Sequence, residues 1–420
     1  MELIAGSPPA TDVEDAVRDR MRTLPGRYRT EAADGFAAEF HLSVDEVPFR
    51  VSIADGRCTV GDERPAFPTA RISMNAETWL ALDEGSVTSI EAFLDGRILV
   101  RGNIDQAVRM QSLFVPSGRP RTSQDLDHAE IRVGSEVLSC FDLGEGPPVV
   151  LLHGLGATKL SWMPLLAPLA ERFRVVVPDL PGHGESSKPR ASYTPRFYAG
   201  VIRRLLDAID EEGAVFIGNS MGGRIAIEVA ARAPSRVAGL VLLGPAAAGL
   251  PFPYYARLLR LVPTKLGAVP MPMRRKLVLR GIRQLLAAPD RLPSNAYLAG
   301  ADEFIRVYRS GRARVALLAA IRGLMRDRPD LFWDAARQVA APTLIVHGDR
   351  DRLVPLRMSE VLASTLPRAE LVRLPGVGHV PQFEAPEMTI GVVRAFLEEL
   401  YPEASRSRTR KHAPRGWFGS

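Results

Sequence analysis

The sequence predicts an α/β fold, with a mostly parallel sheet covered by helices on both faces, preceded by a smaller α+β domain. From about Thr122 onward, short β-rich runs alternate with helical patterns, which is typical of such a sheet. From Pro245 to Ala340 the pattern is helical only, and an insertion of this length predicts a helical cap, at about 246–338, above the carboxyl edge of the sheet. The first 120 residues mix neighbouring strands with helices, which indicates a separate α+β domain.

The smaller domain is predicted to span residues 1–118. A helical pattern runs from Val13 to Leu24, and alternating strands follow in "GFAAEFHLSV" and "VPFRVSIADGRCTV". A helix, a strand and a final helix complete it. The stretch "FVPSGRPRTSQDLDH" then has the Pro, Gly and polar content of a linker, which we place at 119–128.

The larger domain is predicted to span residues 129–402. Its strand candidates are "VVLLH" (149–153), "RVVVP" (174–178), "AVFIG" (214–218), "RVAGLVLLG" (236–244), "PTLIVHG" (342–348) and "AELVRL" (369–374). Among them, the four apolar residues 214–217, closed by Gly218, are typical of a buried strand. In the cap, Leu residues recur at helical spacing with Arg between them, in "YYARLLRLVPTKL" and "RRKLVLRGIRQLL", and we expect the Leu faces to pack on the cap or on an acyl chain.

Composition excludes several classes of function. Hydrophobic residues make up 46% of the 420 residues and charged residues 24%, which is typical of a globular protein. Five of the six net positive charges lie in the last fifteen residues, so we expect no nucleic-acid partner. The segment 403–420 is predicted to be a disordered basic tail that could make weak peripheral contact with an anionic membrane.

The cysteines and the N-terminus indicate a cytoplasmic protein without a metal. Cys58 and Cys140 are far apart in the sequence, so neither a disulfide framework nor a zinc site is expected. The sequence begins without the basic and apolar regions of a signal peptide, and no apolar run approaches 18 residues. We expect no cofactor, and the oligomeric state is left open.

A serine stands where a strand is predicted to give way to a helix. Ser220 lies in Gly218-Asn219-Ser220-Met221-Gly222, a G-x-S-x-G pattern in which the glycines let strand and helix pass closely. A seryl hydroxyl is a poor nucleophile unless a base takes its proton. We therefore predict Ser220 as a nucleophile only if a histidine and an orienting acid accompany it.

Both partners occur downstream, in loops that follow predicted strands. Asp351 lies in "LIVHGDRDRLVP" and His379 in "LPGVGHVPQFEAPE", which gives the order Ser, Asp, His. His379 would take the seryl proton, and Asp351 would hold the tautomer of its ring. Asp349 is the competing acid.

The oxyanion and substrate contacts are assigned to the neighbouring loops. The segment "HGLG", His153 to Gly156, could aim the N–H of Leu155 at the same point as the N–H of Met221, which predicts an oxyanion hole. His153 and Trp162 are the candidates for contact with substrate. A role for His153 in holding the loop is the alternative.

Five motifs in order resemble those of the α/β-hydrolase superfamily. They are "HGLGATKLSW", "PDLPGHGESSKP", "GNSMGG", "GDRDRLVP" and "GVGHVPQFEAPE", over roughly residues 128–402. The resemblance implies the α/β-hydrolase fold and places the family's acid, the last residue of a G-x-x-D turn, on Asp351. The segment "GNSMGG", the turn that presents the serine, is similar to the nucleophile elbow of meta-cleavage-product C-C hydrolases, and many esterases share it. Related dehalogenases and epoxide hydrolases use Asp as nucleophile, so Ser220 argues against both.

The N-terminal part is similar to a second family. Residues 72–114, above all "DGRILVRGNIDQAVRMQSLF", resemble the closing half of a sterol-carrier-protein-2 domain, an α+β lipid-binding module. The resemblance implies a hydrophobic tunnel for sterols or fatty-acyl chains. The alternative is that the apolar residues only fill a core. These residues are Trp79, Leu80, Phe93, Met110, Leu113 and Phe114.

Together these patterns favour a serine hydrolase that cleaves carboxylic esters or thioesters of hydrophobic acyl or lipid substrates, as esterases and lipases do, through an acyl-enzyme. A C-C bond hydrolase of the meta-cleavage-product type is one alternative, although its small anionic substrates do not need a lipid-binding domain. A non-catalytic lipid carrier is another, but it would have no use for the Ser, Asp and His together. Acyl length, and sterol against linear lipid, stay open.

Overall fold

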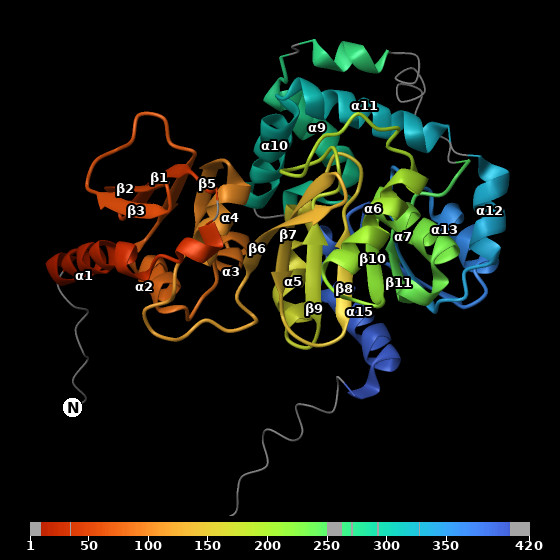
Figure 1. Ribbon diagram of the computed structural model, residues 1–420, viewed down its shortest axis with the longest axis horizontal. Helices are drawn as coiled ribbons and strands as arrows, with labels where there is room; N and C mark the ends of the chain where they lie inside the picture. The colour runs from red at the N-terminus through yellow and green to blue at the C-terminus, as the bar shows by residue number, and fades with distance from the viewer. Residues whose placement is uncertain are drawn as a thin grey trace, which may run out of the picture. The chain divides into compact units, whose positions relative to one another are not determined.

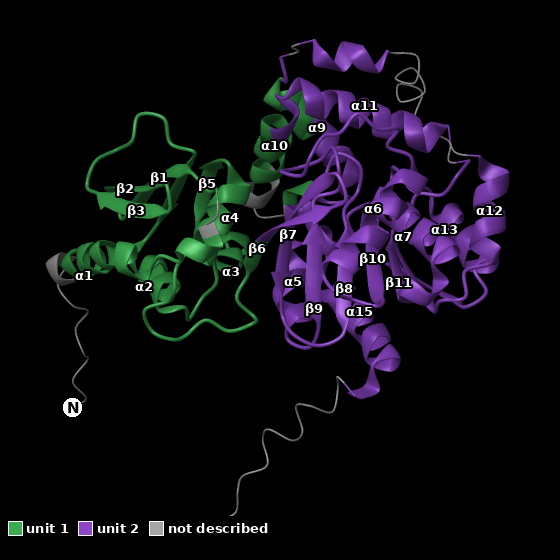
Figure 2. Ribbon diagram, in the orientation of Figure 1, with its two compact units in different colours: residues 1–128, 274–279, 289–306 green, residues 129–273, 280–288, 307–420 purple. Residues whose placement is uncertain are grey.

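The computed structural model describes residues 10–33, 35–249, 263–269, 272–291, 294–326 and 328–403. The chain divides into two compact units, shown in green and purple in Figure 2. The first comprises residues 1–128, 274–279 and 289–306, and the second comprises 129–273, 280–288 and 307–420. The predicted tail beyond Glu403 and most of the first predicted cap helix lie outside the described residues.

The first unit contains a five-stranded sheet with the strand order β3-β2-β1-β4-β5. Figure 1 labels four of its strands, β1, β2, β3 and β5. Its strands are β1 (Ala38–Val44), β2 (Val47–Ala54), β3 (Arg57–Gly61), β4 (Ala70–Met74) and β5 (Leu99–Gly102). Its helices include α1 (Ala10–Thr23), α2 (Ala76–Glu84), α3 (Ser89–Leu94) and α4 (Ile104–Ser112). Buried and partly exposed residues alternate along β1, so one face of the sheet carries the core. The predicted α+β pattern is confirmed, although β4 was not predicted and a single helix was predicted where α2 and α3 lie.

The second unit contains an eight-stranded sheet with the order β13-β12-β11-β10-β8-β9-β7-β6. The strands are β6 (Asp127–Val133), β7 (Glu136–Leu143), β8 (Pro148–Leu152), β9 (Arg174–Pro178), β10 (Ala214–Asn219), β11 (Val237–Leu243), β12 (Thr343–Gly348) and β13 (Ala369–Leu374). The strands from β8 to β13 pair in parallel, and β7 pairs antiparallel with β9. All six predicted strands are present, whereas β6 and β7 were not predicted.

Helices cover this sheet in two groups. α5 (Met163–Ala170) and α15 (Pro386–Leu400) pack together, while α6 (Pro195–Ala208), α7 (Met221–Arg232), α12 (Pro329–Arg337) and α13 (Leu356–Thr365) form the other group. All six residues of β10 are buried, which is the pattern of a strand with a helical layer on either face. The predicted α/β fold is confirmed.

The regular elements described in the insertion between β11 and β12 are all helices. It contains α9 (Arg275–Leu285), α10 (Ser294–Tyr308), α11 (Gly311–Met325) and α12, and the described residues between 245 and 340 form no strand, as predicted. None of the helices in the described ranges is long and apolar enough to cross a membrane.

Candidate active site

Ser220 lies in a strained turn between β10 and α7. Its φ of 51° and ψ of −112° are sparsely populated for a residue with a Cβ, and such strain costs about 1–3 kcal/mol. The turn is tight, because a Cβ at Gly218 would lie 2.4 Å from the carbonyl carbon of Gly222, and a Cβ at Gly222 would lie 1.9 Å from the oxygen of Leu152. The turn that presents Ser220 therefore has no room for a side chain at position 218 or 222, and only glycine fits at both.

Hydrogen bonds tie this turn to the neighbouring strand ends. The N–H of Ser220 donates to the carbonyl of Leu243, at 3.0 Å, at the end of β11. The side-chain amide of Asn219 donates to the same carbonyl at 3.0 Å and to the carbonyl of His379 at 3.1 Å. The turn is thus bonded directly to the loop that carries His379.

Asp351 and His379 form a buried pair. Nδ1 of His379 lies 2.7 Å from Oδ2 of Asp351, and Oδ1 of Asp351 accepts N–H bonds from Leu353 and Val354 at 2.8 and 2.9 Å. Burial alone would raise the pKa of Asp351, but the hydrogen bond with His379 and the two backbone bonds lower it below its ordinary value. An ionised Asp351 accepts the proton of Nδ1, which leaves Nε2 of His379 as the proton acceptor.

Gly244 is the point at which the serine turn and this pair meet. It directly follows Leu243, whose carbonyl accepts from Ser220. A Cβ at Gly244 would lie 3.3 Å from Oδ2 of Asp351 and 3.4 Å from Nδ1 of His379. Ser220, Asp351 and His379 follow β10, β12 and β13, so they gather at the carboxyl edge of the parallel sheet, where ligands bind in open α/β folds.

Asp349, the competing acid, faces elsewhere. Its Oδ1 accepts the N–H of Gly376 at 2.7 Å, and its side chain is 40% exposed. The structure therefore pairs His379 with Asp351.

The backbone segments that carry the two N–H groups predicted for the oxyanion both border Ser220. Met221 is the first residue of α7, so its N–H has no acceptor within the helix and lies at the positive end of the helix dipole. Leu155 directly follows Gly154, where a Cβ would lie 3.4 Å from the Cβ of Ser220. Both groups thus belong to backbone that borders the serine.

His153 and Trp162 are buried, in contrast to the expectation that they contact substrate. Neither has any exposed surface. Nε2 of His153 accepts the N–H of Leu180 at 3.0 Å, so Nδ1 carries the proton and donates to the carbonyl of Gly154 at 2.8 Å. Burial lowers the pKa of His153, which keeps the ring neutral. Its bonds hold the Gly154 turn in place from inside the protein, which is the alternative role considered for it.

A buried ion pair beside this loop was not predicted. Nζ of Lys159 lies 2.9 Å from Oδ2 of Asp179, and the N–H groups of Lys159 and Glu185 donate to the same carboxylate at 2.7 and 2.9 Å. Burial would raise the pKa of Asp179, but the charge of Lys159 lowers it. The pair fixes the "PDLPGHGES" loop. Within the described ranges, His, Cys, Asp and Glu side chains form no cluster that could hold a metal ion.

The first unit contains an open cavity, and the unfilled space of about 850 Å³ within it and at its mouth includes open solvent. Most of its wall is apolar and comes from the inner face of the sheet and from α2, α3 and α4. The apolar lining residues are Leu24, Leu42, Ile72, Met74, Trp79, Leu82, Phe93, Ile98, Val100, Ala107, Val108, Met110, Phe114, Val115 and Pro116. Of the six apolar residues singled out from the sequence, four line the cavity: Trp79, Phe93, Met110 and Phe114.

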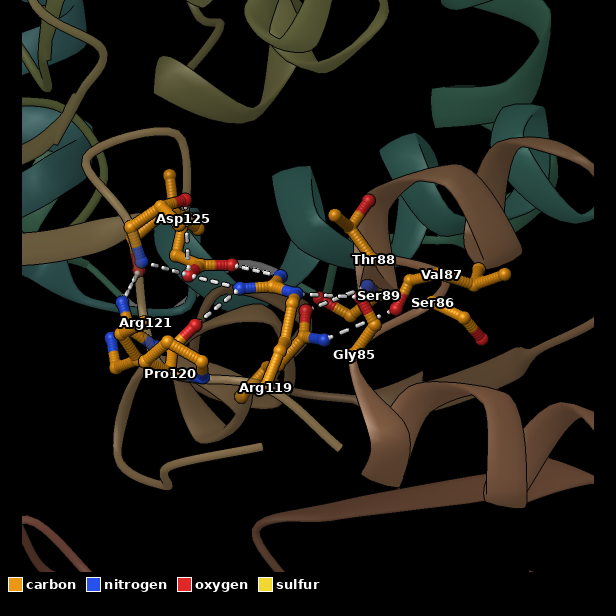
Figure 3. A network of polar contacts seen from close by, with 12 residues as sticks. Gly85, Ser86, Val87, Thr88, Ser89, Arg119, Pro120, Arg121 and Asp125 are labelled. Atoms are coloured by element: carbon orange, nitrogen blue, oxygen red, sulfur yellow. Dashed lines mark hydrogen bonds and ion pairs between the residues drawn. The ribbon is translucent and has the colours of Figure 1, made fainter. Parts of the chain in front are cut away.

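Some of the residues that line the cavity are polar, and one of them, Asp125, belongs to the network of polar contacts in Figure 3. Arg119 donates to the carbonyl of Gly85 at 2.8 Å and to both carboxylate oxygens of Asp125 at 2.7 and 2.5 Å. Burial would raise the pKa of Asp125, but the bond from Arg119 lowers it. Ser89, whose N–H donates to the side-chain oxygen of Gln111 at 2.7 Å, also lines the cavity. The cavity therefore combines an apolar interior with a charged and polar border.

Comparison with known proteins gives two family matches. Residues 147–386 match the family described as alpha/beta hydrolase fold, and residues 19–115 match the SCP-2 sterol transfer family.

Individual relatives differ in activity. The 2-hydroxymuconate semialdehyde hydrolase of Pseudomonas sp. (strain CF600) is 31% identical over 296 residues, which covers 68% of this chain and 96% of the relative. The dihydrolipoyllysine-residue acetyltransferase component of the acetoin cleaving system of Pseudomonas putida is 34% identical over 299 residues, 70% of this chain and 76% of the relative. This chain also resembles the structure of a thermophilic esterase from Thermogutta terrifontis, with a sequence identity of 27% and a TM-score of 0.56. The match covers 66% of this chain and 99% of the esterase.

Proposed function

Because this chain belongs to the alpha/beta hydrolase fold family, we propose that it is a serine hydrolase that cleaves carboxylic esters or thioesters of hydrophobic acyl compounds. The observation that carries the proposal is the strained elbow of Ser220, hydrogen-bonded to the loop of a buried Asp351–His379 pair. A serine presented on a strained turn that is bonded to the loop of an oriented imidazole fits nucleophilic acyl transfer.

The proposed reaction has two steps. Oγ of Ser220 attacks the carbonyl carbon of the ester while Nε2 of His379 takes its proton, and Asp351 stabilises the imidazolium. The N–H groups of Leu155 and Met221 bind the oxyanion. The tetrahedral intermediate collapses, His379 protonates the departing alcohol or thiol, and an acyl-enzyme remains. Water then attacks the acyl carbon with His379 as base, and the acid and free Ser220 are released.

An ester series from C2 to C16 tests the substrate class. Each methylene that becomes buried adds about 0.8 kcal/mol, so kcat/KM is expected to rise about fourfold per methylene until the acyl pocket ends. Ser220→Ala is the matched control for background hydrolysis. A steady fall of kcat/KM from C2 upward would refute the preference for hydrophobic acyl groups.

C-C bond hydrolysis is the second candidate. It is favoured by the 31% identity to the 2-hydroxymuconate semialdehyde hydrolase, in an alignment that covers 96% of that enzyme. Its test uses the same wild-type preparation with a 2-hydroxy-6-oxo-dienoic acid as substrate. A kcat/KM for the dienoic acid above that for every ester would replace the ester proposal with this one.

For the first unit we propose that it binds a lipid in its cavity. The indole N–H of Trp79 is buried there without a partner among the described residues, so it is free to donate to a polar group of a ligand.

Displacement of a fluorescent fatty acid measures binding. Val108→Trp places a large side chain in the cavity and should raise Kd at least tenfold, whereas Leu99→Trp adds the same side chain at an exposed position and should not. Equal affinities would refute binding in this cavity.

A further inference from the structure

The loop that carries His379 is bonded to the C-terminal end of α9. The backbone N–H of His379 donates to the carbonyl of Leu285, the last residue of that helix, at 2.7 Å. Two residues further on, the N–H of Ala287 donates to Oε2 of Glu384 at 2.7 Å. All four residues belong to the second unit. The inserted helical segment is therefore joined by one hydrogen bond to the candidate base, His379, and by a second to Glu384.

Glu384 also holds the backbone on both sides of His379. Its Oε2 accepts the N–H of Gly378 at 3.1 Å, and its Oε1 accepts the N–H of Val380 at 3.3 Å. Its own N–H donates to the carbonyl of Val380 at 2.9 Å, which fixes Glu384 to the same loop. One carboxylate thus accepts three backbone N–H groups, two from the histidine loop and one from the segment after α9.

Gly378 shows how closely the two segments pack. A Cβ at this position would lie 2.6 Å from Oε1 of Glu384 and 2.7 Å from both the N of Ala287 and the O of Leu285. Atoms this close leave no room for a side chain or a water molecule. The two segments cannot separate without breaking the bonds made by His379 and Glu384.

We propose that Glu384 is a positioning residue that holds His379 in its working orientation and makes that orientation depend on the docked Leu285–Ala287 segment. The proposal rests on the proposed role of His379 as base. Removing the carboxylate leaves three backbone N–H groups without their acceptor, so the loop is expected to shift. A displacement of about 1 Å in a catalytic group costs about 100-fold in rate. Glu384→Ala should therefore lower kcat by about 10- to 100-fold with little change in KM.

Glu384→Gln is the conservative variant. Its amide oxygen can replace Oε2 and accept from Ala287 and Gly378, but its NH₂ group then faces the N–H of Val380. This variant should recover part of the lost kcat. Glu387→Ala is the matched control, because Glu387 is an exposed acid three residues further on, and its kcat should equal that of the wild type.

The experiment measures kcat, KM and the rate of labelling by a fluorophosphonate for the full-length wild type, Glu384→Ala, Glu384→Gln, Glu387→Ala and Ser220→Ala. The proton NMR spectrum adds a direct readout, since the downfield proton on Nδ1 of His379 should shift in both Glu384 variants and not in Glu387→Ala. If Glu384→Ala folds and keeps the kcat and the labelling rate of the wild type, the positioning role is overturned. If Glu384→Ala does not fold, the same result for Glu384→Gln, with an unshifted Nδ1 proton, overturns it. A wild type that is neither labelled nor active would overturn the proposed function, and this inference with it.

Discussion

Replacing Asp351 by Asn changes the proposed acid with almost no change in shape. Oδ1 of Asp351 accepts from Leu353 and Val354, and Oδ2 faces Nδ1 of His379. The Asn oxygen is expected to take the place of Oδ1, because the opposite orientation sets an NH₂ group against two buried N–H donors, at about 1–3 kcal/mol for each unpaired group. Its NH₂ group then faces Nδ1, which must accept, so the ring proton moves to Nε2. Since Nε2 can then no longer take the proton of Ser220, we expect kcat to fall about 10⁴-fold, or about 5 kcal/mol of barrier.

The matched control is Asp349→Asn, two residues away. Asp349 is 40% exposed and accepts only from Gly376 among the described residues, so its kcat should stay within about twofold of the wild type. The assay is kcat on the best ester of the series, with the thermal midpoint of each variant to show that it is folded. Equal losses for the two variants, or a larger loss for Asp349→Asn, would refute the assignment of the acid.

Two further variants and one thiol reagent test the packing of the protein. Gly222→Ala should lower the free energy of unfolding by about 3 kcal/mol or more, because its Cβ would lie 1.9 Å from a backbone oxygen at the end of β8, and calorimetry would show it. Lys159→Met should cost about 3–5 kcal/mol, since Asp179 stays charged and buried without its partner, and an unchanged urea midpoint would contradict this. Cys58 and Cys140 should react with a disulfide reagent at about pH 8 only after unfolding, because burial raises the pKa of Cys58 to about 11 and raises that of Cys140 too, so both thiols stay protonated. Rapid modification of the native protein would argue against that burial.

The parallel sheet and the serine turn could be predicted because their physical requirements are local in the sequence. A strand buried on both faces needs a continuous apolar run, and the predicted runs 174–178 and 214–218 coincide with β9 and with all but the last residue of β10. The turn at Ser220 needs glycines at fixed positions, which the sequence shows directly.

The hairpin of β6 and β7 was missed because β6 is only partly buried and mixes polar with apolar residues, so no continuous apolar run marks it. The bonds made by Glu384 were missed for a different reason. Its partner Ala287 lies 97 residues away in the sequence, and neither periodicity nor spacing carries information about such a pair. The burial of His153 and Trp162 was missed for a similar reason. The motif "HGLGATKLSW" shows where the loop lies in the sequence, but the burial of its side chains depends on how the whole domain packs around it.

The proposed covalent step can be observed most directly as an acyl-enzyme. The wild-type protein is mixed with a long-chain p-nitrophenyl ester, quenched in acid within the first turnover, digested, and mapped by mass spectrometry. We expect one acyl group on the peptide that contains Ser220, and none at that position in Ser220→Ala. An acyl group on another residue, or rapid ester cleavage by Ser220→Ala, would contradict the assignment of Ser220 as the nucleophile.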